Sequence, residues 1–190
     1  MPTLLAITTL LLVAAITPGP NNIVMMRTGA RRGVRGTLPA MTGVLLGGIA
    51  MLALTVTGAG VVFTRWPMLR LGVAIGGGLY LVWLGVHLLR AAGKEGEVKL
   101  PAGIIGLFVF QFFNPKGWVM LLTMAAVLPP GSALQTFARL APLFVGISAG
   151  CLLLWGAAGH MLAMANPTTQ RWIDRVLGVC LIASTLLLFH

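Results

Sequence analysis

Two short helix-breaking motifs stand at corresponding places in the two halves of this chain. The first break consists of Thr17, Pro18, Gly19, Pro20, Asn21 and Asn22, and the second consists of Asn114, Pro115, Lys116 and Gly117. If the halves are taken as 1–95 and 96–190, Pro18 is residue 18 of the first half and Asn114 is residue 19 of the second. Paired interruptions of apolar helices in two halves of a chain are typical of a transporter's substrate site.

Each break is expected to leave backbone N–H and C=O groups without a helical partner, and these groups determine the chemistry expected there. Proline removes a backbone donor and disrupts the preceding turn. Inside hydrocarbon each unsatisfied backbone group costs several kcal/mol, so a break must face protein or a wet cavity. Asn21 and Asn22 are expected to cap the restarted helix with their side-chain oxygens. The positive end of that helix would suit a carboxylate. A kink with a structural role alone is the alternative.

Lys116 is the charged residue that lies deepest in an apolar segment. It is 13 residues beyond Gly103, where the segment starts, which is about 20 Å at 1.5 Å per helical residue. A lysine this deep needs a partner inside the protein. The partner is either a backbone carbonyl at the first break or a substrate carboxylate, and a purely structural role is the alternative. Gln111, one helical turn before Asn114, is expected to face the same cavity.

Two ionisable residues are candidates for proton coupling. His160 lies in the fifth apolar segment and Asp174 lies one turn into the sixth. Ionisable groups within membrane segments are functional candidates by default. The alternative for His160 is a neutral ring that hydrogen-bonds a carbonyl. The alternative for Asp174 is that it balances Arg171 and Arg175 beside it.

Composition identifies the elements that must position these residues. The chain has 190 residues, of which 58% are hydrophobic and 8% are charged, so most of it must face lipid. We predict an all-α integral membrane protein that forms one transmembrane domain over 1–190, with inverted three-helix repeats in 1–95 and 96–190. The apolar runs predict six spans, of which the first and fourth are broken: 3–26, 38–63, 68–90, 103–128, 138–164 and 172–189. The tight link at 64–67 predicts an antiparallel hairpin of the second and third spans.

The basic residues predict the orientation of these spans. The first, third and fifth loops hold nine Lys and Arg residues, among them Arg27 in the first loop, and the other loops hold three. By the positive-inside rule the odd loops are cytoplasmic and both termini lie outside. The net charge of +10 therefore reflects membrane orientation and not nucleic-acid binding. Three G-x-x-x-G pairs, Gly43 with Gly47, Gly72 with Gly76, and Gly146 with Gly150, are expected to bring helices close together.

At these motifs the sequence resembles the LysE/RhtB family of bacterial amino-acid exporters. The first break is similar to that family's first motif, and the glycines that follow, Gly29, Gly33 and Gly36, are spaced as in the family. The stretches 78–85 and 111–118 also resemble family motifs. Asn21-Asn22, 158–160 and the Arg171-Trp172 region resemble most the branch that exports cysteine and O-acetylserine.

The resemblance implies a secondary transporter of the bacterial inner membrane that exports amino acids or their derivatives by proton antiport, without a cofactor. No nucleotide-binding G-x-x-x-x-G-K-[ST] motif is present, which agrees with this. Homo-oligomers are left open. No paired carboxylates, Ser/His/Asp grouping or metal-ligand cluster predicts an enzyme. A heavy-metal or cation exporter, and a membrane thiol–disulfide shuttle that would use Cys151 and Cys180, are the alternatives.

The motifs together suggest one mechanism. The substrate's carboxylate would lie near the helix ends after Pro20 and Pro115, with Lys116 as its counter-charge. The substrate's ammonium would meet carbonyls freed at Thr17 and Phe113. The halves 1–95 and 96–190 would then rock to expose the site to each side in turn.

Overall fold

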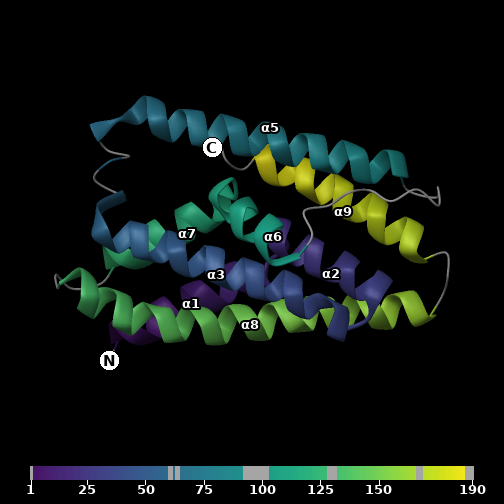
Figure 1. Ribbon diagram of the computed structural model, residues 1–190, viewed down its shortest axis with the longest axis horizontal. Helices are drawn as coiled ribbons and strands as arrows, with labels where there is room; N and C mark the ends of the chain where they lie inside the picture. The colour runs from purple at the N-terminus through teal and green to yellow at the C-terminus, as the bar shows by residue number, and fades with distance from the viewer. Residues whose placement is uncertain are drawn as a thin grey trace.

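The computed structural model describes residues 2–59, 62, 65–91, 103–127, 132–165 and 169–186, and no strand occurs among them (Figure 1). The α-helices are α1 (Pro2–Ile16), α2 (Pro20–Arg32), α3 (Leu38–Leu54), α5 (Pro67–Ala91), α6 (Gly103–Phe112), α7 (Pro115–Val127), α8 (Ala133–Ala165) and α9 (Thr169–Leu186). A short 3₁₀ helix, η1 (Arg35–Thr37), precedes α3, and a π-helical turn, η2 (Thr55–Ala59), follows it. The prediction of an all-helical protein agrees with these elements.

Both predicted breaks are present and each bends the chain. The axes of α1 and α2 differ by 51°, and those of α6 and α7 differ by 64°. Each restarted helix begins at a proline, Pro20 in α2 and Pro115 in α7. Proline suits the first helical position because the N–H that it lacks would have no intrahelical partner there. The same local chemistry therefore restarts the helix in both halves.

Five elements of the described chain have the length and apolarity to cross a membrane. Three are single helices, Arg35–Gly58, Pro67–Arg90 and Ala133–Met164, and two are the bent pairs α1–α2 and α6–α7 if each pair counts as one span. The predicted sixth span, 172–189, corresponds to α9, which carries three charged residues near its start and is not among these five. Six spans in two inverted repeats therefore stay a prediction.

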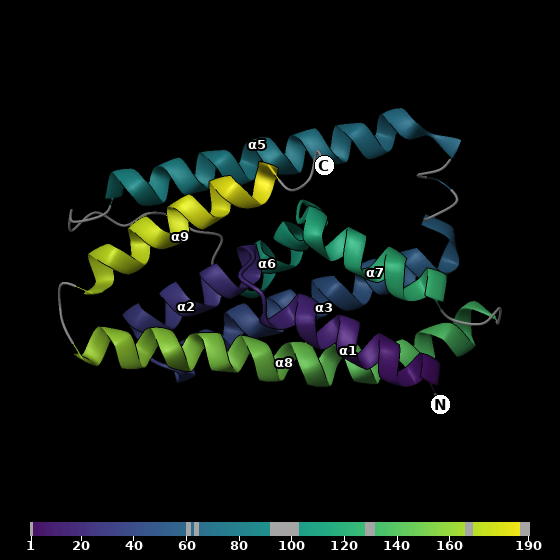
Figure 2. The ribbon, with the colours of Figure 1, turned by 180° about the vertical axis from the view of Figure 1, so that it is seen from behind.

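The most extensive helix packing joins the first half of the chain to the second. α2 packs along α8, α3 along α6, and α5 along α9, as Figures 1 and 2 show from opposite sides. The predicted α3–α5 hairpin is therefore wrong as a packed pair, because α6 and α9 supply the main neighbours of these helices. The two halves therefore interleave instead of forming two separate bodies.

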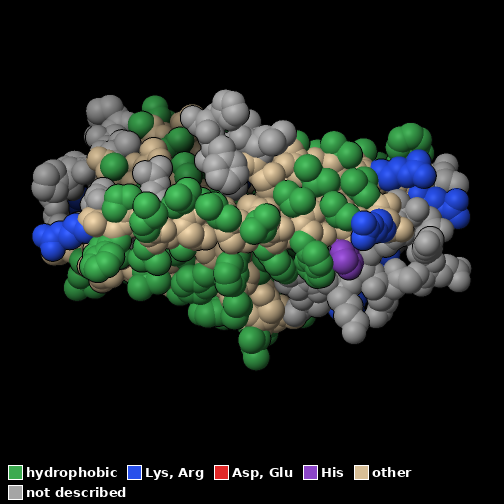
Figure 3. All heavy atoms as spheres, turned by 90° about the horizontal axis from the view of Figure 1, so that it is seen from above, with side chains coloured by type: hydrophobic (Ala, Val, Ile, Leu, Met, Phe, Trp, Pro, Cys, Tyr) green, Lys and Arg blue, Asp and Glu red, His purple; other side chains and the backbone are tan. Residues whose placement is uncertain are grey.

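The molecule is elongated, and the exposed basic side chains in Figure 3 lie toward its two ends, with apolar side chains between them. We call one end the arginine-rich end, where α2 and α5 finish and α9 starts. Its exposed arginines are Arg31, Arg32, Arg35, Arg90, Arg171 and Arg175. The opposite end has exposed Arg65 and Arg139. Among the described residues, the end that the positive-inside rule assigns to the cytoplasm thus has more exposed arginines than the opposite end.

Candidate functional site between the two broken helices

The first break satisfies every carbonyl at the end of α1. The carbonyls of Val13 and Ala14 accept hydrogen bonds from the Thr17 hydroxyl, at 2.9 and 3.0 Å. Asn22 Nδ2 donates to the carbonyls of Ala15 and Thr17, both at 2.8 Å. The indole N–H of Trp155 on α8 donates to the next carbonyl, that of residue 16, at 3.2 Å. The carbonyls that the break leaves at the end of α1 are therefore all hydrogen-bonded, as their burial in a membrane would require.

The predicted capping role of Asn21 and Asn22 is wrong. Gly19 occupies the N-cap position of α2 and no side chain caps that helix. The two asparagines lie inside the first turn of α2, because Pro20 already begins the helix. Asn22 instead turns back to the freed carbonyls of α1, and Asn21 points across to the other half of the chain.

Lys116 reaches from the second break to the first. Its Nζ donates to the carbonyl oxygen of Thr17 at 2.9 Å and to the hydroxyl of Thr17 at 2.8 Å. The side chain lies across Gly19, where an added Cβ would be 3.1 Å from both Cδ and Nζ of Lys116. Of the two partners expected for Lys116, the structure thus shows the backbone carbonyl of the first break, a contact that a purely structural lysine would also make.

The second break is similar but leaves one acceptor unpaired. The Trp118 indole donates to the Phe112 carbonyl at 3.0 Å, and the Asn114 carbonyl accepts from the N–H groups of Gly117 and Trp118. Asn114 is 3% exposed, and within the described chain its side-chain Oδ1 has no hydrogen-bond partner. A buried acceptor without a partner is costly. It therefore indicates a position where a ligand donor or water can bind.

Asn21 and Gln111 form a reciprocal amide pair across the two halves. Asn21 Nδ2 donates to Gln111 Oε1 and Gln111 Nε2 donates to Asn21 Oδ1, both at 2.9 Å. The pair joins α2 to α6 beside both breaks. Close packing makes this possible, since a Cβ on Gly47 of α3 would come within 2.6 Å of the Gln111 side chain.

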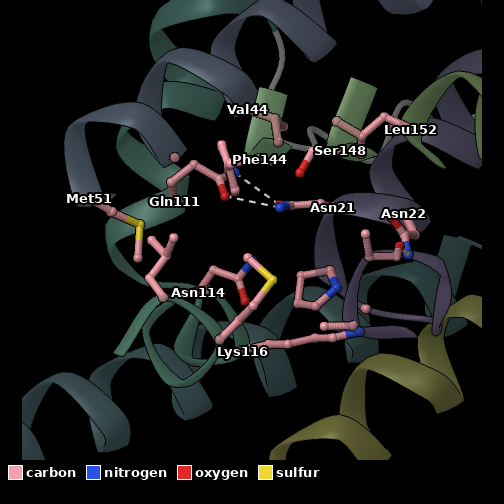
Figure 4. Close-up of a pocket in the computed structure, with 18 residues that line it drawn as sticks. Asn21, Asn22, Val44, Met51, Gln111, Asn114, Lys116, Phe144, Ser148 and Leu152 are labelled. Carbon is pink, nitrogen blue, oxygen red and sulfur yellow. Dashed lines mark hydrogen bonds between the residues drawn. The ribbon is translucent and has the colours of Figure 1, made fainter. Parts of the chain in front are cut away.

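These groups surround one cavity of about 60 Å³. Figure 4 shows the Asn21–Gln111 pair on one side of it, Asn114 facing that pair, and Lys116 extending past them toward the first break. Both restarted helices, α2 and α7, begin at its wall. The other lining residues are mostly apolar and come from α1, α3, α7 and α8: Ala14, Ala15, Val44, Gly48, Met51, Gly117, Met120, Leu121, Phe144, Ser148 and Leu152.

Most of the predicted substrate-binding residues line this cavity. They are Gly19, Pro20, Asn21, Asn22, Gln111, Asn114 and Lys116. Thr17, Pro18 and Pro115 shape the breaks but are not part of the wall. The Thr17 carbonyl cannot serve as the ammonium acceptor that we expected, because Lys116 and Asn22 already donate to it.

Sequence reasoning missed the contribution of α8 to the cavity. Ser148 is the polar residue that α8 supplies to the wall, and Trp155 on the same helix pairs with the first break. A lone serine in an apolar segment gives little signal. A tryptophan placed well inside a predicted span is more informative, because its buried N–H needs an acceptor.

The two proton-coupling candidates lie away from the cavity wall. His160 on α8 lies near Gly33, at the arginine-rich end. Asp174 on α9 is 3% exposed, and its Oδ1 is 2.9 Å from Nε of Arg27. The interpretation that Asp174 balances Arg171 and Arg175 is therefore wrong. The placement of Arg27 in a loop is wrong too, because α2 continues through Arg32.

The two alternative functions find no matching cluster in the described part of the chain. No group of three or more His, Cys, Asp or Glu residues in that part is arranged to hold a metal ion. Cys151 on α8 and Cys180 on α9 are free thiols, and neither is part of the cavity wall. A thiol shuttle needs its cysteines at the breaks, where this chain has Gly19 and Lys116.

Known efflux proteins are similar in sequence to this chain. The profile of the family described as "LysE type translocator" matches residues 12–190. A cysteine/O-acetylserine efflux protein of Escherichia coli O139:H28 is 29% identical over all of this chain and 99% of its own length. A threonine efflux protein of Escherichia coli K12 is 26% identical over 87% of this chain and 75% of its own length. No solved structure matches the chain with significance.

Proposed function

This chain belongs to the family of LysE type translocators, and we propose that it exports small amino acids or their derivatives from the bacterial cytoplasm. Family membership makes it a multi-pass membrane transporter and not an enzyme, as the sequence predicted. The proposal adds the substrate, the binding site and the energy source.

One observation carries the proposal: the two broken helices of opposite halves meet at one cavity and supply most of the polar groups of its wall. Lys116, the Asn21–Gln111 pair and the unpaired Oδ1 of Asn114 all border it. Half-helix ends that face each other across inverted repeats suit a substrate whose two ends carry opposite charges. In this arrangement the carboxylate binds at the starts of α2 and α7 beside Lys116, and the ammonium donates to Asn114 Oδ1.

The wall of the cavity favours a small neutral side chain. Among the described residues of the wall there is one cationic residue, Lys116, and no acidic residue, so an amino acid with a basic side chain would find no counter-charge there. The volume of about 60 Å³ is less than half of the cavity of about 150 Å³ that accepts benzene in an engineered protein. The cavity must therefore widen to admit any amino acid, and a small one requires the least widening. Cysteine, O-acetylserine and threonine, named in the two relatives, are small and have neutral side chains.

Proton antiport would supply sufficient energy for export. One proton that enters at about 150 mV supplies roughly 3.5 kcal/mol, which supports a gradient of a few hundred-fold for a neutral zwitterion. Asp174, which faces Arg27 and Arg31, and His160 remain the candidate proton carriers. In this proposal the arginine-rich end faces the cytoplasm of a bacterial inner membrane, and both termini lie outside.

Efflux from preloaded cells tests the proposal. Cells that express the chain are loaded with labelled cysteine, O-acetylserine, threonine or lysine, and efflux is followed with and without an uncoupler. We expect uncoupler-sensitive efflux of one or more of the first three and none of lysine. Lys116→Ala should lose that efflux at equal membrane abundance.

Absence of efflux for every amino acid, with the protein present in the membrane, would contradict the proposal. The same cells would then be tested with heavy-metal ions and for thiol–disulfide exchange. A Cys151→Ala/Cys180→Ala variant distinguishes thiol–disulfide exchange from metal export, because only a thiol shuttle requires both sulfurs.

A further inference from the structure

A buried ion pair joins α2 of the first half to α9 of the second. Arg27 Nε lies 2.9 Å from Asp174 Oδ1, and the two side chains are 2% and 4% exposed. Asp174 is the only acidic residue in the described part of the chain. Arg27 therefore has one partner of opposite charge there, and separating α2 from α9 would leave both charges alone.

This pair is incompletely satisfied. All three guanidinium nitrogens of Arg27 and Oδ1 of Asp174 are buried, and none of them has a hydrogen bond to another described residue. Nε is close to the carboxylate and the two charges attract each other, but no hydrogen bond of good geometry joins them. Burying such a pair costs desolvation energy that only good hydrogen-bond geometry repays. The buried pair therefore makes the closed arrangement little more stable than one in which water solvates both groups. The contact is thus suited to break and re-form.

Close helix packing surrounds the ion pair at the arginine-rich end. Glycines let helices touch there: a Cβ on Gly29 would overlap the Gly156 carbonyl, and one on Gly85 would be 2.7 Å from the Gly178 oxygen. The helices that carry Arg27 and Asp174 are thus packed tightly against their neighbours, and this end of the molecule is closed.

We propose that Arg27 and Asp174 form the latch that keeps the arginine-rich end closed, and that transport requires this latch to separate. The proposal rests on the transporter function proposed above. Replacing one partner buries a lone charge in the closed state, so the equilibrium moves to the open state, where water solvates that charge. Replacing both partners by apolar residues removes the cost of closure and holds this end closed.

Labelling of a cysteine in the cavity tests the latch without reference to any substrate. The background is Cys151→Ala/Cys180→Ala/Ser148→Cys, treated with a membrane-impermeant maleimide in vesicles of both orientations. Arg35→Cys in the background without the cavity cysteine identifies the vesicles that expose the arginine-rich end. Leu152→Cys is a second reporter on the same wall.

We expect the reporter to react slowly from the arginine-rich side in the background protein. Asp174→Asn should raise that rate by about tenfold or more, since breaking one side of a buried pair shifts an equilibrium at least that far. The apolar pair Arg27→Met/Asp174→Leu should keep the slow rate and lose export. Arg31→Gln is the matched control, because Arg31 is partly exposed and lies 3.9 Å from the same carboxylate, and it should leave the rate unchanged.

Three results would overturn the latch. One is an unchanged labelling rate in Asp174→Asn with the protein folded, and another is an equal increase in Arg31→Gln. The third is full export by the apolar double variant, as expected if the pair only holds the fold together. If the chain exports no amino acid, the labelling still reports the latch, so failure of the two proposals can be told apart.

Discussion

The two breaks are built from the same kinds of residue, yet among the described residues only the second leaves a buried side-chain atom unpaired. At the first break Thr17, Asn22 and Trp155 satisfy the carbonyls that α1 leaves free. At the second, Trp118 satisfies one carbonyl, while Asn114 Oδ1 is buried without a partner among the described residues. The difference suggests a division of labour. The first break is a completed structural element that also holds Lys116, and the second presents the group that would bind a ligand.

Asn22→Ala should have the largest effect and should act on folding. It removes both hydrogen bonds from Nδ2 and leaves the Ala15 carbonyl unpaired, at a cost of ~1–3 kcal/mol. We expect membrane abundance of the folded protein to fall several-fold, measured by quantitative immunoblot and by thermal stability in detergent. Normal stability would contradict the structural role of the first break.

Asn114→Ala should affect export and spare the fold. It removes an oxygen that has no hydrogen-bond partner among the described residues, so abundance should match the parent protein. A hydrogen bond to a charged group contributes ~1.5–3 kcal/mol, so we expect an increase of about tenfold or more in the substrate concentration for half-maximal transport. A fall in abundance as large as that of Asn22→Ala would remove the distinction between the breaks.

The Asn21–Gln111 pair links the breaks and should show coupled effects. Asn21→Ala and Gln111→Ala each leave one amide unpaired at the cavity, and we expect each to slow efflux a few-fold. The double variant should be no worse than the worse single variant, because the two residues form one reciprocal contact. Additive losses in a double-mutant cycle of efflux rates would mean that each amide acts separately on the substrate.

Gly19→Ala should have the smallest effect of this series. The added Cβ would sit 3.1 Å from Cδ and Nζ of Lys116, a tight contact that the flexible lysine can relieve by a small shift. We expect a modest decrease in the efflux rate. Gly72→Ala is the matched control, because nothing lies within 4 Å of a Cβ there, and an equal decrease in it would exclude displacement of Lys116 as the cause.

Local features of this fold could be predicted from the sequence. Proline and glycine dictate both breaks, and α2 and α7 restart at the prolines as expected. Because Lys116 lies deep in an apolar segment, the sequence predicts that it pairs with a backbone carbonyl of the first break or with a substrate carboxylate. In the structure it donates to the Thr17 carbonyl. These predictions succeeded because each depends on backbone chemistry within a few residues, or on the cost of an unpaired charge.

Contacts between distant helices could not be predicted. The sequence places Arg27 in a loop because the run of apolar residues ends before it. In the structure α2 continues to Arg32, and Arg27 is buried against Asp174 of α9. The glycine motifs show the same limit. Gly43 and Gly47 pack against α6 as predicted, whereas Gly72, Gly76, Gly146 and Gly150 have no neighbour within 4 Å of an added Cβ. The spacing is identical, and only the arrangement of helices decides which glycines are used.

Substrate protection of the cavity is the most direct test of the central claim, that the exported amino acid binds between the two breaks. The reporter is Ser148→Cys without the native cysteines, after its efflux has been verified. The rate of maleimide labelling is measured as the exported amino acid is added, with lysine as the control compound. We expect slower labelling with the exported amino acid, no change with lysine, and loss of protection in Asn114→Ala. Undiminished labelling at a concentration that saturates efflux would place the substrate elsewhere.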